Sequence, residues 1–151
     1  MRSFVFALVA VLSAVSAYFA ASYWQSQRQV AVLNAGVPCD LGEGPCKHAL
    51  PGGGQLTVEL TPRPVPLMET VRVSVEVAGT AMLPSHIEIT GLNMEMGVNR
   101  VALEPTSETR WEGETIIPIC SQRQMHWRSA LLLQSGSELR RIDDEFYTLR
   151  P

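Results

Sequence analysis

The protein has 151 residues, of which 46% are hydrophobic and 18% are charged, and its formal net charge is −3. Because folded domains comprise roughly 100–200 residues, this length predicts one folded unit with a single small core. The sequence pI of about 5.6 leaves no basic field to attract phosphate groups, which excludes nucleic acid as an expected partner.

An apolar segment opens the chain. Residues 3–27 include no charged side chain, and the run FVFALVAVLSAVSAYFAASYW supplies about twenty mostly apolar residues. At 1.5 Å per residue, a helix of that length crosses a hydrocarbon core of ~30 Å. Tyr18, Tyr23 and Trp24 lie at the distal end, where aromatic rings favour the membrane interface. The pattern predicts that residues 1–28 form an uncleaved single-pass anchor.

A cleaved signal peptide is the alternative for the same segment. Small residues at 20–22 offer a weak cleavage site, although the apolar run is long for a signal peptide. Arg2 precedes the segment and Arg28 follows it, so the charge bias is slight, but the N-terminal tail is short. We therefore expect the rest of the chain to lie outside the cytoplasm.

Cysteine usage agrees with an oxidising compartment. Cys39 and Cys46 bracket DLGEGP, a turn-rich loop whose ends can approach each other, which predicts a disulfide between them. Cys120 is then left over as a free thiol, although its pairing with either of the other two stays open. Residues 29–53 are expected to form a cysteine-containing linker that ends in a flexible hinge at ALPGGGQ.

The remaining residues, 54–151, alternate apolar and polar side chains in short segments. Four valines at 71, 73, 75 and 77 share one face of an extended segment, as in a half-buried strand. Strands are expected at 55–61, 70–77, 86–92, 99–105, 110–119, 126–135 and 146–150. No amphipathic helix of useful length is expected after the anchor. This pattern predicts an all-β immunoglobulin-like sandwich preceded by one N-terminal transmembrane helix.

Enzyme signatures are missing from the sequence. It contains no G-x-S-x-G, no P-loop and no H-E-x-x-H motif, and its three histidines are scattered. The acidic run at 143–145 is expected to be a solvated turn, because too few carboxylates cluster to hold calcium. We expect no catalytic residues and no enzymatic activity.

Candidate metal ligands lie in two segments. Met94 and Met96 in GLNMEMG would project to one side of an extended strand. Met125 and His126 follow Cys120 in CSQRQMHW, which is expected to be a turn between strands. Thioether, thiolate and imidazole are donors that Cu(I) prefers, whereas core packing explains the same methionines equally well. For Cys120, burial or a disulfide is favoured over a role as ligand.

With one short anchor, an outer β domain, MEMG and CSQRQMHW, the chain resembles the small bacterial FixH/YtkA-type proteins over roughly residues 54–150. The resemblance implies a periplasmic sandwich on a single-pass inner-membrane anchor, with a role in copper handling and respiratory-oxidase assembly. Among the residues it implies Met94 and Met96 as copper ligands, and Met125 less strongly. The cysteine loop has no counterpart in that pattern.

Two functional readings follow from the sequence. In the first, the chain is a membrane-tethered module that binds or delivers Cu(I) during respiratory-oxidase assembly. In the second, it is a metal-free interaction domain that stabilises or assembles a membrane protein complex through its edge strands or loops.

Overall fold

A computed structural model describes residue 11 and residues 13–21, 30–34, 36 and 38–150. The chain divides into two units, Met1–Val30 and Ala31–Pro151. In the first unit, residue 11 and residues 13–21 are helical, and the rest of the predicted anchor lies outside the described residues. No helix within the described ranges is long and apolar enough to cross a membrane.

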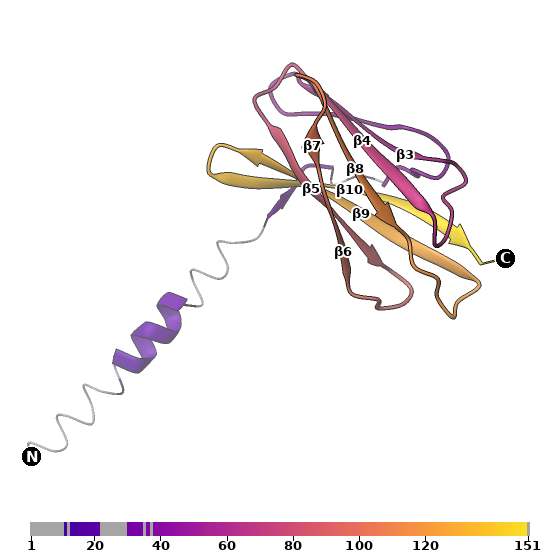
Figure 1. Cartoon of the computed structure of the whole chain (residues 1–151). Helices are drawn as coiled ribbons and strands as arrows, with labels where there is room; N and C mark the ends of the chain where they lie inside the picture. The colour runs from indigo at the N-terminus through magenta and orange to yellow at the C-terminus, as the bar shows by residue number, and fades with distance from the viewer. Residues whose placement is uncertain (1–10, 12, 22–29, 35, 37, 151) are drawn as a thin grey trace, which may run out of the picture. The chain divides into compact units, whose positions relative to one another are not determined.

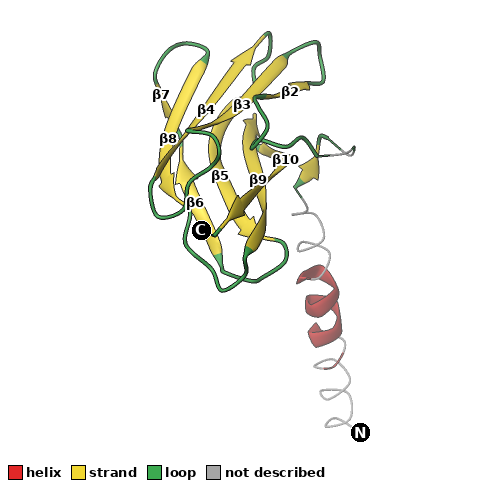
Figure 2. Ribbon diagram, turned by 90° about the vertical axis from the view of Figure 1, so that its right-hand side faces the viewer, coloured by secondary structure: helices red, strands yellow, loops and turns green. Residues whose placement is uncertain are grey.

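The second unit is an all-β sandwich of two five-stranded sheets (Figures 1 and 2). The first sheet has the order β1 (Ala31–Val32), β10 (Glu138–Leu149), β9 (Gln124–Ser135), β5 (Leu83–Gly91) and β6 (Val98–Ala102). The second has the order β2 (Cys46–Ala49), β3 (Gln55–Thr61), β4 (Thr70–Ala78), β8 (Arg110–Ile116) and β7 (Glu104–Pro105). The predicted all-β class is confirmed.

The alternation of side chains sets the two inner faces of the sandwich. In β4, all four valines at 71, 73, 75 and 77 are buried, while the intervening polar side chains face outward. Trp127 on β9 and Phe146 on β10 are the largest fully buried side chains, and their rings stack with centroids 6.2 Å apart. Burial of aromatic rings and branched aliphatic chains against the facing sheet is the main stabilising contribution to such a fold.

The predicted disulfide between Cys39 and Cys46 is present, and Cys120 is a free, buried cysteine. The surrounding residues differ from the expected linker, because residues 29–53 contain β1 and β2, which belong to the two sheets. The expected hinge is the turn of the β2–β3 hairpin. There the Leu50 N–H donates to the Gly54 carbonyl at 2.7 Å, and Gly52 and Gly53 have positive φ angles.

Strand β10 is covered along one edge by segments from the start of the unit. β1 pairs with it in parallel, joining Ala31 to Arg140 in register. Further on, Glu145 on β10 donates its N–H to the Cys39 carbonyl at 2.9 Å and accepts from the Leu41 N–H at 2.8 Å. These bonds satisfy backbone groups that an open sheet edge would expose.

Two loops meet at one end of the sandwich. β5 and β9 are antiparallel neighbours with Gly91 opposite Trp127, so the end of β5 lies beside the start of β9. The β5–β6 loop at 92–97 and the β8–β9 loop at 117–123 therefore emerge together (Figure 1). Antiparallel register thus brings segments about thirty residues apart to the same end.

Candidate metal centre

The loop at 92–97 is fastened to the beginning of β9 by three hydrogen bonds. The Leu92 N–H donates to the His126 carbonyl at 2.8 Å, and the His126 N–H donates to Oδ1 of Asn93 at 3.0 Å. Nδ2 of Asn93 also donates to the Gln124 carbonyl at 2.9 Å. The position of the methionines in this loop is therefore defined by the neighbouring strand.

Met94 and Cys120 bring their sulfur atoms together from the two loops. The Cys120 thiol donates to Sδ of Met94 with a sulfur–sulfur distance of 2.9 Å. The Gln122 N–H donates to Sγ of Cys120 at 3.5 Å, and the Ser121 hydroxyl to Sδ of Met94 at 3.7 Å. Cys120 is 8% exposed and Met94 is 38% exposed, so the sulfur pair lies at the boundary between core and solvent.

Met125, at the start of β9, is near the backbone of the loop that carries Met94. It is 2% exposed, and its Cε would be 3.1 Å from a Cβ added to Gly91. The same added Cβ would collide with the carbonyl oxygen of Met94. The Met125 methyl group and the backbone of Met94 therefore both pack against the bare Cα of Gly91, which only glycine allows.

The predicted geometry of Met94 and Met96 is different from the observed one. Residues 92–97 form a loop rather than an extended strand, so the two side chains do not project from one strand face. Met96 is half-buried and packs against the hydrophobic core. Gly91 ends β5, because the tight approach of the loop backbone at that point replaces the regular ladder.

His126 is separated from the sulfur atoms. Met125 and His126 are in β9 rather than in a turn, and successive side chains of a strand point to opposite faces. Nε2 of His126 is 2.6 Å from Oε2 of Glu145, and its ring stacks on Tyr147 with centroids 4.4 Å apart. The imidazole thus belongs to the outer face of the sheet.

The arrangement offers soft donors to an ion. A thiolate from Cys120 and thioethers from Met94 and Met125 are the ligands that select Cu(I) over hard cations. The sequence alone favours burial or a disulfide for Cys120 over a role as ligand, and the structure shows a free, buried thiol. Its position beside Met94 depends on the pairing of β5 with β9, which no local sequence pattern specifies.

Comparison with known proteins places the chain in no family. No family model matches it, and no curated protein matches it. Among solved structures, it is similar to a DUF4785 family protein from Legionella pneumophila, with 13% sequence identity and a TM-score of 0.44. That match covers 61% of this chain and 27% of the other chain, and a likeness this distant identifies neither a family nor a function.

Proposed function

We propose that the protein is a membrane-tethered, extracytoplasmic module that binds one Cu(I) ion and delivers it during assembly of a respiratory oxidase. The observation that carries this proposal is the contact between Sγ of Cys120 and Sδ of Met94, at 2.9 Å. The buried Met125 packs near the backbone of the Met94 loop at Gly91. Two sulfur donors from neighbouring loops and a third from the start of β9 make a soft ligand set at one end of the sandwich.

The proposed ligands are Cys120, Met94 and Met125, with Met96 as a further candidate from the same loop. His126 is left out, because its Nε2 is held by Glu145 on the outer face. The partial exposure of Met94, at 38%, suits delivery, since an acceptor can displace an exposed thioether while the buried ligands still hold the ion. Binding and release require no catalytic residue.

The tether, the compartment and the finer fold class belong to the same proposal. The apolar, uncharged run at 3–27 supports an inner-membrane anchor with the sandwich in the periplasm. The two-sheet arrangement with a parallel edge strand, β1, supports an immunoglobulin-like topology. The role in oxidase assembly rests on the resemblance to FixH/YtkA-type proteins.

The test is a Cu(I) titration of the purified full chain under anaerobic conditions, with ascorbate to keep copper reduced and a chromophoric chelator in competition. Ascorbate leaves the disulfide intact. We expect one Cu(I) per chain, with affinity lowered in Cys120→Ser, Met94→Leu and Met125→Leu. Each loss should be at least the roughly 10–100-fold that outer-shell partners cause, because these residues touch the ion. Leucine keeps the volume and apolarity of methionine.

Met82→Leu is the matched control. Met82 is half-buried against the core in the β4–β5 connection, at the opposite end of the strands from the sulfur pair, so its replacement should leave the affinity unchanged. If the wild-type protein retains no Cu(I), or if it and the three variants retain it equally, the copper proposal is wrong. Comparison of a Met94→Leu/Met96→Leu double variant with Met94→Leu alone measures whether Met96 contributes to the affinity for Cu(I).

A metal-free interaction domain is the second candidate, and exposed apolar side chains at the same end favour it. Ile116 and Ile119 are 51% and 50% exposed, Val98 is 60% exposed and Leu149 is 69% exposed. Their replacement by serine should lower the amount of assembled oxidase in cells without changing the copper content of the purified protein. Loss of copper in the same variants would instead contradict the metal-free interaction reading.

A further inference from the structure

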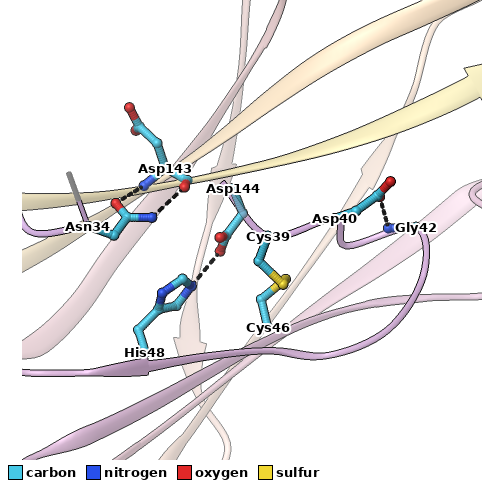
Figure 3. The surroundings of a disulfide bond; sticks show 8 residues. All are labelled: Asn34, Cys39, Asp40, Gly42, Cys46, His48, Asp143 and Asp144. Atoms are coloured by element: carbon cyan, nitrogen blue, oxygen red, sulfur yellow. Dashed lines mark hydrogen bonds and ion pairs between the residues drawn. A yellow bond between two sulfur atoms is a disulfide. The ribbon is translucent and has the colours of Figure 1, made fainter. Parts of the chain in front are cut away.

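A second group of potential metal ligands surrounds the disulfide (Figure 3). Sγ of Cys39, Sγ of Cys46 and a carboxylate oxygen of Asp144 all lie within 4.8 Å of one another. The two cysteine Cα atoms are 5.8 Å apart. Asp144, in the run expected to be a solvated turn, is inside β10 and only 1% exposed.

The fold brings these residues together from both sheets. Cys39 is held beside β10 by the hydrogen bond from the Glu145 N–H to its carbonyl, at 2.9 Å. Cys46 begins β2 in the facing sheet, and His48 follows on the same face of that strand. Nε2 of His48 donates to Oδ2 of Asp144 at 2.9 Å, which orients the carboxylate (Figure 3).

The other carboxylate oxygen of Asp144, Oδ1, favours metal binding over packing alone. Within the described part of the chain, Oδ1 is buried and has no hydrogen-bond partner. Burying a carboxylate oxygen without a donor or a cation is costly, so native proteins pair such atoms. A buried carboxylate with one unpaired oxygen, on a side chain that reaches to within 4.8 Å of two sulfur atoms, has the composition of a metal-ligand set that lacks only the thiolates.

We propose that Cys39, Cys46 and Asp144 form a site for a divalent ion of the zinc class that opens when the disulfide is reduced. A dithiol reductant supplies two electrons and two protons, becomes a disulfide itself and leaves two cysteine thiols. The ion then replaces the two thiol protons, which are released to solvent. Two thiolates and a carboxylate give three protein ligands, and water takes the fourth position of a tetrahedron.

His48 is a positioning residue in this site. By holding Oδ2, it leaves Oδ1 free for the ion, as outer-shell partners do for metal-binding carboxylates. The site is separate from the proposed copper ligands. On the β9–β10 ladder, Asp144 pairs with Ser129 and Met125 pairs with Thr148, four residue pairs further along.

The test uses the purified full chain carrying Cys120→Ser, so that the pair at 39 and 46 supplies the only thiols. The protein is reduced with a phosphine under anaerobic conditions and titrated with Co²⁺, whose absorption reports tetrahedral geometry and thiolate charge transfer. We expect one Co²⁺ per reduced chain with thiolate bands, displacement by an equal amount of Zn²⁺, and no bands from the oxidised chain. Circular dichroism checks that the reduced chain stays folded.

Asp144→Asn is the informative variant, because asparagine keeps the shape and the acceptor for His48 but removes the charge. It should weaken binding at least as much as the roughly 10–100-fold loss of an outer-shell partner. Asp143→Asn, one residue away and facing the other side, is the matched control and should bind normally. His48→Leu should weaken binding and His48→Gln, which keeps a donor, should restore it.

Three outcomes overturn the proposal. The first is a folded, reduced chain that shows no thiolate–cobalt bands. The second is equal affinity for Co²⁺ in Asp144→Asn and the parent protein, which would remove the carboxylate from the ligand set. The third is a reduced chain that unfolds and that Zn²⁺ does not refold.

Discussion

Reduction of the disulfide should lower the free energy of unfolding of the sandwich by about 2.5 kcal/mol. Cys39 and Cys46 are 7 positions apart, so the bridge closes a loop of about eight residues. The chain-entropy relation for a loop of that size gives about 2.5 kcal/mol at room temperature. The native fold should survive, because the hydrogen bonds that join Cys39 and Leu41 to Glu145 do not depend on the bridge.

Equilibrium unfolding in urea, with and without a phosphine reductant, measures this difference. Tryptophan fluorescence is a suitable probe, since Trp127 is 1% exposed and loses its buried environment on unfolding. With a typical slope of about 1–3 kcal/mol per molar urea, the midpoint should fall by roughly 0.8–2.5 M. A change in free energy below about 0.5 kcal/mol would refute the loop-entropy reasoning, because the bridge would then constrain nothing in the unfolded chain.

Three further substitutions test individual contacts. Gly91→Ala drives a Cβ into the loop that follows it and should cost about 1–3 kcal/mol in urea unfolding, so an unchanged midpoint would contradict the tight packing there. Thr148→Val leaves the buried indole N–H of Trp127 without its acceptor at 2.9 Å and should cost about 1–3 kcal/mol, whereas a neutral effect would mean that water replaces the hydroxyl. A hydrogen bond from Arg100 lowers the pKa of Glu88 from its usual 4.5, so the ionised carboxylate stabilises the fold above that pH. Glu88→Gln should therefore slightly lower the thermal midpoint at pH 7. The difference between the two proteins should vanish as the pH falls through the lowered pKa. A difference that persists in acid would exclude the charge as its cause.

Alternation of apolar side chains was enough to predict most of the strands. The segment 55–61 coincides with β3, and 70–77 differs from β4 by one residue, because each places branched aliphatic chains on one face. The disulfide could be predicted for a similarly local reason, since turn residues fill the short loop between the cysteines. Local sequence patterns were therefore sufficient to predict the all-β class and the disulfide.

Long-range pairing could not be predicted in the same way. β1 has only two residues, and CKHA in β2 lacks an alternating apolar pattern, so both depend on partners elsewhere in the chain. The contact between Met94 and Cys120 depends on the register that sets Gly91 opposite Trp127. No feature within either loop specifies that register, which is why the thiol was not recognised as a neighbour of the methionine.

The parallel pairing along the edge of β10 also dictates an order of events during synthesis. Ala31 pairs with Arg140, so β1, the first strand to be synthesised, cannot pair until β10, the last strand, has been made. Contacts between residues this far apart in sequence close late, because the intervening chain must first be ordered. The cysteine loop is likewise held beside β10 through Glu145. A nascent chain that has not yet supplied β10 therefore leaves Cys39 without its hydrogen bond to Glu145, whereas Cys46 can already pair through β2 with β3. The environment of Cys39 is completed only when the final hairpin folds.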